Sequence, residues 1–142
     1  MGFESREYEE RTKSKLKSSK KPILALAFCK ISLKYATGHE NGEINIYSAA
    51  DNRLIDQLLS HNGAVRCLEY DKNGKLYAGG SDGVVRVWNL QAKREPRTLE
   101  LHSSEIVAMK LNEKNKLICT ASTANELVVV DYTGINILMS TR

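Results

Sequence analysis

The sequence lacks several features that would place it outside the cell or in a membrane. No run of about 18 apolar residues occurs, which is the length that a membrane-spanning helix needs. The first residues, MGFESREYEE, are charged where a signal peptide would be apolar, and Arg6 stands where the N-myristoylation pattern has Ser or Thr. The three cysteines, Cys29, Cys67 and Cys119, form no CxxC pair, which argues against a disulfide framework. These absences predict an intracellular protein, cytoplasmic or nuclear, without a transmembrane segment.

Patterns typical of catalytic, metal and cofactor sites are also missing. His61, Ser81 and Asp82 are the residue types of a catalytic triad, but no nucleophile accompanies a base and an oxyanion donor at a meaningful spacing. The histidines His39, His61 and His102 lack the paired spacing of metal ligands. The glycine-rich stretches GHENG and GGSDG do not open a helix, as a phosphate-binding loop does. We therefore predict no enzymatic activity, no metal and no cofactor.

The net charge of +4 is concentrated near the N-terminus. Residues 11–21, RTKSKLKSSKK, contain six basic residues and no acidic residue, and four glutamates precede them. Because residues 1–21 have almost no apolar face, we expect an arm that is disordered or a frayed helix. The alternative is a basic arm that binds RNA, anionic lipid or an acidic protein, although no aromatic residue interrupts its lysines to stack on bases.

After Pro22 the sequence changes to short apolar and β-branched runs separated by Gly, Asn, Asp and Ser. This pattern predicts twelve β-strands without intervening helices. The predicted strands cover residues 23–28, 33–37, 43–48, 54–59, 64–70, 75–80, 84–90, 97–101, 105–111, 116–121, 126–131 and 135–140.

These strands recur in groups of four with a period of 41 or 42 residues. His61 and His102 each precede the first strand of a group, and the turn Asn41-Gly42 recurs as Asp82-Gly83. The third strands end on Tyr47, Trp88 and Val130. A fixed period of this length with four strands per unit predicts a radially repeated sheet.

The middle group resembles a blade of the WD-repeat (Trp-Asp repeat) β-propeller family. It has Ser60-His61 before its first strand, Asp82 in the turn after the second and Trp88-Asn89 at the end of the third. The resemblance extends over residues 22–140. It implies an all-β propeller of about three four-stranded antiparallel blades, at 22–60, 61–101 and 102–142. Since closed propellers have typically four to eight blades, three blades form an incomplete ring.

The resemblance also implies a buried hydrogen-bond network in each blade, which joins a histidine, a hydroxyl, the turn aspartate and the tryptophan. A buried indole N–H needs an acceptor, because it can only donate. In the middle blade the network implies His61, Asp82 and Trp88, with Gly80 in place of the hydroxyl. In the third blade it implies His102 and Ser122, with Ala124 and Val130 in place of the Asp and the Trp. The first blade has Lys20, His39, Asn41 and Tyr47 at the four places.

WD-repeat propellers are protein-interaction scaffolds, and the resemblance implies this function for the present chain. The family's contact positions lie at the bulge of the first strand and before the turn aspartate. They fall on Arg66, Ala64 and Ser81 in the middle blade, Glu105, Val107 and Thr123 in the third, and Leu24, Pro22 and Glu40 in the first. Arg66 is the strongest candidate, since arginine is enriched at binding hot spots. The alternatives are that Arg66 is a solvated rim residue and that Leu24 and Val107 belong to the core.

An arc of three blades leaves an apolar sheet face open at each end. Three arrangements would cover these faces: a longer propeller of which the chain is a piece, a second polypeptide that completes the ring, or self-association.

Overall fold

The computed structural model describes residues 21–59, 62–92 and 95–141, and within these ranges the chain forms twelve strands and no helix. The first sheet contains β1 (Ile23–Phe28), β2 (Lys34–His39), β3 (Glu43–Ser48) and β4 (Leu54–Leu59). The second contains β5 (Val65–Tyr70), β6 (Leu76–Gly80), β7 (Val84–Trp88) and β8 (Arg97–Glu100). The third contains β9 (Ile106–Asn112), β10 (Leu117–Ser122), β11 (Leu127–Asp131) and β12 (Ile137–Ser140). No helix that could cross a membrane occurs in the described ranges.

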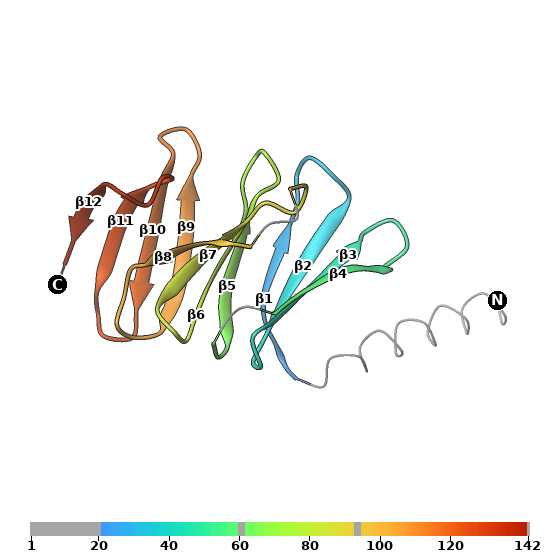
Figure 1. Ribbon diagram of the computed structural model, residues 1–142, viewed down its shortest axis with the longest axis horizontal. Coiled ribbons are helices and arrows are strands. Elements are labelled where there is room, and N and C mark those ends of the chain that lie inside the picture. The colour runs from blue at the N-terminus through green and yellow to red at the C-terminus, as the bar shows by residue number, and fades with distance from the viewer. Residues whose placement is uncertain (1–20, 60–61, 93–94, 142) are drawn as a thin grey trace, which may run out of the picture.

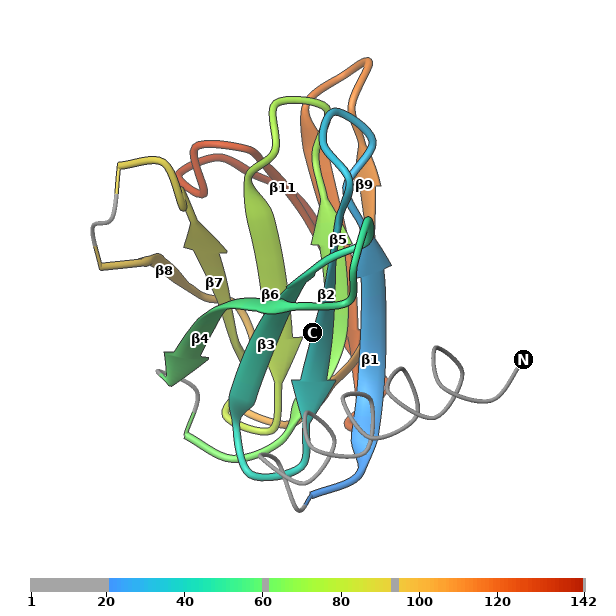
Figure 2. The same ribbon diagram turned by 90° about the vertical axis from the view of Figure 1, so that its right-hand side faces the viewer.

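The predicted all-β fold with three four-stranded antiparallel units is confirmed. In each sheet the strands pair in chain order, and the three sheets stand side by side as successive blades (Figure 1). The first strands β1, β5 and β9 lie along one edge of the stack, and the fourth strands β4 and β8 lie at the opposite edge (Figure 2). The three sheets fall within residues 22–60, 61–101 and 102–142. The basic segment 11–21, apart from Lys21, and His61 lie outside the described residues.

The core lies between the sheets, because strand alternation gives each sheet two apolar faces. Between the first and second sheets, Ala36, Ile44 and Ile46 belong to one buried cluster with Val65, Leu68, Tyr70, Leu76, Ala78 and Trp88. Between the second and third sheets, a second cluster contains Tyr77, Val85, Val87, Leu99, Ile106, Met109, Ile118, Val128 and Val130. Only the middle sheet is therefore covered on both faces by other described sheets.

The outward face of the first sheet carries a row of stacked aromatic rings. The ring centroids of Phe28 and Tyr35 are 6.3 Å apart, and those of Tyr35 and Tyr47 are 5.2 Å apart. In the strand register this row corresponds to Tyr70, Leu76 and Trp88 of the second sheet, which pack against the first sheet. Phe28 is 60% exposed. The first sheet thus presents the same face that the second sheet buries, as expected of an incomplete ring.

The turn before β7 provides a test of the packing between the second and third sheets. Gly83 has φ 75°, and its carbonyl oxygen accepts a hydrogen bond from the His102 amide at 3.1 Å. A Cβ at this position would collide with the carbonyl oxygen of His102. Backbone strain and this clash together predict that Gly83→Ala lowers the free energy of unfolding by about 2–4 kcal/mol, measured by urea denaturation.

Gly74 is the matched control, because it also has a positive φ of 84°. A Cβ there meets only the flexible end of Ile31, at 3.1 Å. Gly74→Ala should therefore cost about 1 kcal/mol, from backbone strain alone. Equal losses in the two variants would contradict the role assigned to the contact between Gly83 and His102.

Candidate functional site

A β-bulge interrupts each first strand close to its start. The register shifts at Leu24 in β1, at Arg66 in β5 and at Val107 in β9, three of the predicted contact positions. A bulge locally breaks the alternation of side chains and redirects one of them. The Arg66 side chain is 40% exposed and Val107 is 46% exposed, so neither is a core residue, whereas Leu24 is half-buried.

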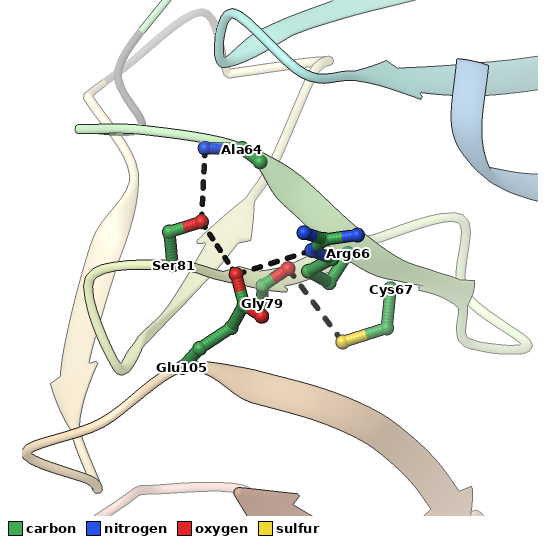
Figure 3. Close-up of polar contacts among 6 residues, drawn as sticks. All are labelled: Ala64, Arg66, Cys67, Gly79, Ser81 and Glu105. Atoms are coloured by element: carbon green, nitrogen blue, oxygen red, sulfur yellow. Dashed lines mark hydrogen bonds and ion pairs between the residues drawn. The ribbon is translucent and has the colours of Figure 1, made fainter. Parts of the chain in front are cut away.

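Arg66, Ser81 and Glu105 meet at the junction of the second and third sheets (Figure 3). The Ser81 hydroxyl donates to Glu105 Oε2 at 2.8 Å, and Arg66 Nε donates to the same oxygen at 3.1 Å. The backbone amide of Ala64 donates to the Ser81 hydroxyl at 3.2 Å. We call these four residues, Ala64, Arg66, Ser81 and Glu105, the rim cluster. They come from the start of β5, the β6–β7 turn and the segment before β9.

The remaining predicted contact residues lie at different distances from the rim cluster. The Thr123 amide donates to the Glu105 carbonyl oxygen at 2.9 Å, so Thr123 adjoins the cluster. Val107 is two residues beyond Glu105 in the chain. Glu40 lies in the first sheet instead, where its amide donates to the Pro22 carbonyl oxygen at 3.2 Å, and it is exposed. The structure thus brings the predicted positions of the middle and third blades together and leaves that of the first blade apart.

The rim cluster leaves part of Arg66 available for binding. The hydrogen bond from Ser81, followed by that from Arg66, holds the pKa of Glu105 below its ordinary value, so the carboxylate is ionised at neutral pH. Within the described part of the chain, Arg66 forms hydrogen bonds only through Nε. Both terminal guanidinium nitrogens can therefore bind a carboxylate or carbonyl oxygen of a partner. Since the Arg66–Glu105 pair is partly exposed, it contributes little to stability and instead orients the guanidinium.

Cys67 lies next to the rim cluster but has no nucleophilic character. Its thiol contacts the Gly79 carbonyl oxygen at 3.6 Å (Figure 3). Burial raises the pKa of Cys67 to about 12, so the thiol stays protonated at neutral pH. Among the described residues, no group of three or more His, Cys, Asp or Glu side chains could hold a metal ion.

The buried histidine network of the third sheet differs from the prediction in one residue. His102 Nε2 is 2.8 Å from the hydroxyl of Thr120, whereas the Ser122 hydroxyl accepts from the Ala124 amide at 3.3 Å. The assignment of Ser122 as the hydroxyl partner of His102 is therefore wrong. Ser122 is closer to the β10–β11 turn and bonds the backbone of that turn. Thr120 lies two residues earlier on the same face of β10, within hydrogen-bond distance of the imidazole.

The strand register places Thr37 and Ala78 at the position of Thr120 in the other two sheets. In the first sheet Thr37 bonds the Nε2 atom of His39 at 2.9 Å, so a histidine from the same strand replaces the one from the preceding loop. In the second sheet Ala78 has no hydroxyl. The indole nitrogen of Trp88 is buried and has no acceptor among the described residues. The missing link of the middle blade is thus Ala78, not Gly80.

Asp82 is held in the β6–β7 turn by several contacts. Arg86 donates to it at 2.7 Å, and the amides of Val84 and Asn62 donate at 3.2 and 3.4 Å. The predicted partner His61 is not among the described residues, so the network of His61, Asp82 and Trp88 stays a prediction. The pair of Asp82 and Arg86 was missed, although both residues are only four positions apart in the sequence.

Comparisons with known proteins agree with the fold. The family model described as "WD domain, G-beta repeat" matches residues 52–89. The p21-activated protein kinase-interacting protein 1-like of Xenopus laevis is 30% identical over 92 residues, which are 65% of this chain and 25% of that protein. The angio-associated migratory cell protein of Homo sapiens is 28% identical over 105 residues, which are 74% of this chain and 24% of that protein. The chain thus spans about a quarter of the length of these curated relatives.

The fold is also similar to a chain in the crystal structure of the mitotic checkpoint complex. The TM-score is 0.79 at 16% sequence identity, over 85% of this chain and 37% of that chain. This similarity shows the fold.

The corrected network predicts unequal costs for two substitutions in β10. Thr120→Val keeps the side-chain shape but removes the buried hydrogen bond to His102, and we expect the free energy of unfolding to fall by about 1–3 kcal/mol. Ser122→Ala removes a longer bond to a turn amide and should cost about 0.5–1 kcal/mol. Urea denaturation of both variants checks this order, and a larger loss in Ser122→Ala would restore the original assignment.

The rim cluster predicts how the carboxyl group of Glu105 titrates. Since the Ser81 hydrogen bond, the Arg66 hydrogen bond and the Arg66 charge each lower its pKa, Ser81→Ala and Arg66→Ala should both raise it. The folded pKa lies below the unfolded one, so the stabilisation by this carboxylate is complete above the ordinary glutamate pKa and is lost as the pH falls through the folded value. Side-chain carboxyl NMR measures both changes. The pKa of Asp131, lowered by Thr133 and Asn136, should not change in either variant.

Proposed function

The chain belongs to the WD-repeat β-propeller proteins, and on that premise we propose that it is a non-catalytic protein-interaction subunit of an intracellular assembly, with the rim cluster as its partner-binding site. The rim cluster carries this proposal, because it fixes a partly exposed arginine on a rigid sheet junction. Arg66 is held at Nε by Glu105, which Ser81 holds in turn. A guanidinium that is already oriented loses less side-chain entropy when it binds.

The chemistry of the rim indicates what kind of surface it fits. The terminal nitrogens of Arg66 suit a carboxylate or a backbone carbonyl group. The exposed Val107, on the neighbouring bulge, adds an apolar contact. A partner segment that combines an acidic side chain with an apolar one would match both features.

Completion of the ring is a second part of this proposal. The outward face of the first sheet repeats the face that the second sheet buries, and the third sheet exposes Ile137, Leu138 and Met139 on β12. The relatives that the chain matches are about four times as long as the aligned segment, which supports further blades as the cover. We propose that these blades come from the same polypeptide or from a second chain.

A charge reversal at the rim tests the partner-binding proposal. Proteins bound by the full chain are identified first, and the affinity of each purified partner is then measured against three variants. Arg66→Glu should weaken binding by about 30-fold or more, as expected for a hot-spot arginine. Lys114→Glu makes the same charge change at an exposed position on the β9–β10 turn and should leave the affinity unchanged.

The third variant lacks residues 1–21 and distinguishes the basic arm from the rim. Binding that survives this deletion and is lost in Arg66→Glu supports the rim cluster. Binding that survives Arg66→Glu contradicts the proposal. If that binding is also lost on deletion of the arm and weakens steeply with salt, the arm is the binding element.

A further inference from the structure

A pocket lies at the ends of the first strands opposite to the bulges. It has a volume of about 320 Å³ and is formed where β1, β5 and β9 end. These three strands lie along the same edge of the stack (Figure 2). The lining consists of Leu26, Ala27, Phe28, Lys30, Leu68, Glu69, Tyr70, Lys110, Leu111 and Glu113. We call it the strand-end pocket.

Two lining residues have buried polar atoms that no described residue satisfies. Tyr70 is 8% exposed, and its hydroxyl has no hydrogen-bond partner within the described ranges. The same is true of Glu113 Oε1, which is also buried. A buried polar atom without a partner costs about 1–3 kcal/mol, and such atoms are rare in folded proteins. Together they provide a hydrogen-bond donor and a carboxylate acceptor in one pocket.

The neighbouring carboxylate of Asp71, in contrast, has its hydrogen bonds satisfied within the protein. Asp71 accepts hydrogen bonds from the amides of Asn73 and Lys75 at 2.8 and 3.0 Å and from the Tyr77 hydroxyl at 3.1 Å. This carboxylate needs no further partner, whereas one oxygen of Glu113 does. The contrast indicates that the missing hydrogen bond to Glu113 Oε1 is a local feature, since the carboxylate of Asp71 at the same end of the sheets is satisfied.

The charged residues of the pocket lining are two glutamates, Glu69 and Glu113, and two lysines, Lys30 and Lys110. Burial, followed by the charges of Glu113, Asp71 and Glu69, raises the pKa of the nearby Tyr132 to about 12. Lys30 is exposed, and the side chain of Lys110 is 87% exposed and pairs with Glu69 at 3.5 Å. Glu113 Oε1 has no hydrogen-bond partner among the described residues.

We propose that the strand-end pocket binds the cationic side chain of a peptide, a lysine or an arginine. Glu113 Oε1 accepts a hydrogen bond from the ammonium or guanidinium group, and the Tyr70 hydroxyl donates to a neighbouring backbone carbonyl oxygen of the peptide. Ala27, Leu68 and Leu111 of the lining contact the aliphatic part of the side chain, as the long stem of such residues allows. This site lies at the other end of the first strands from the rim cluster, so its test is independent of the proposed function.

The ligand chemistry is tested with short peptides on the full chain. The probes are Ac-Gly-Leu-Xaa-Leu-Gly-NH₂ with lysine, arginine or norleucine at Xaa, titrated by isothermal calorimetry and by amide NMR. The lysine or the arginine peptide should bind saturably, with shifts at Tyr70 and Glu113, and at least about tenfold more tightly than the norleucine peptide, because a hydrogen bond to a charged group is lost. Equal binding of the norleucine peptide, or no saturable binding of either cationic peptide, would overturn the proposal.

Variants separate a binding role from a structural one. Glu113→Gln should weaken the cationic peptide about tenfold. Tyr70→Phe should weaken it severalfold while the urea midpoint stays the same or rises, since the free protein loses only an unsatisfied hydroxyl. Tyr77→Phe is the matched control: it breaks the bond to Asp71, so the midpoint should fall and the peptide affinity should not change.

The opposite pattern would give the Tyr70 hydroxyl a structural role and no role in binding. If Tyr70→Phe lowers the midpoint as Tyr77→Phe does and leaves the affinity intact, and Glu113→Gln also binds normally, the pocket is not a cation site. Arg66→Glu should leave peptide binding unchanged, so a failure of the rim proposal would not affect this result.

Discussion

The packing of sheet face against sheet face is the constraint on which this structure depends. Each four-stranded sheet has apolar side chains on both faces, and the middle sheet covers both of its own with the two neighbouring sheets. The hydrophobic effect therefore requires a cover for the outward faces of the first and third sheets as well. The aromatic row on the first sheet, Phe28, Tyr35 and Tyr47, is the clearest example. The equivalent row on the second sheet is buried against the first sheet.

The same packing creates two chemically different ends. At the start of the first strands, bulges turn side chains outward and the Gly83 turn approaches the backbone of the next sheet, which brings Arg66, Ser81 and Glu105 together. At the other end the first strands terminate at Phe28, Tyr70 and Asn112, and a pocket remains between them. One end thus offers an oriented cation and the other an unsatisfied carboxylate.

The buried histidines show how the three repeats have diverged while the strand positions stay equivalent. Thr37 and Thr120 occupy the same place in their sheets, and each bonds the Nε2 atom of a histidine that comes from a different part of the repeat. Ala78 occupies this place in the middle sheet, so Trp88 buries its indole nitrogen without an acceptor among the described residues. The repeat that looks most regular in sequence therefore lacks the hydroxyl that the other two repeats place beside a histidine.

Much of the fold could be predicted from the sequence, because strand alternation, turn residues and a period of 41 residues are local or regular signals. All twelve strands lie where the apolar runs predict them. β2 extends to His39, two residues beyond its prediction, since that residue pairs with Ile23. The positions of the bulges were predicted from the family pattern. Which side chains the bulges redirect is known only from the pairing of the strands in the structure.

Which side chains contact each other across strands and sheets could not be predicted from the sequence. Thr120 and Ser122 share one face of β10, so alternation alone cannot decide which of them meets His102. The strand-end pocket is formed by residues from three strands that are about forty positions apart, and no spacing signals it. The amino-acid sequence by itself determined the strands and their repetition, because these depend on neighbouring residues. Only the tertiary structure decided which polar atoms are satisfied, because that depends on distances between sheets.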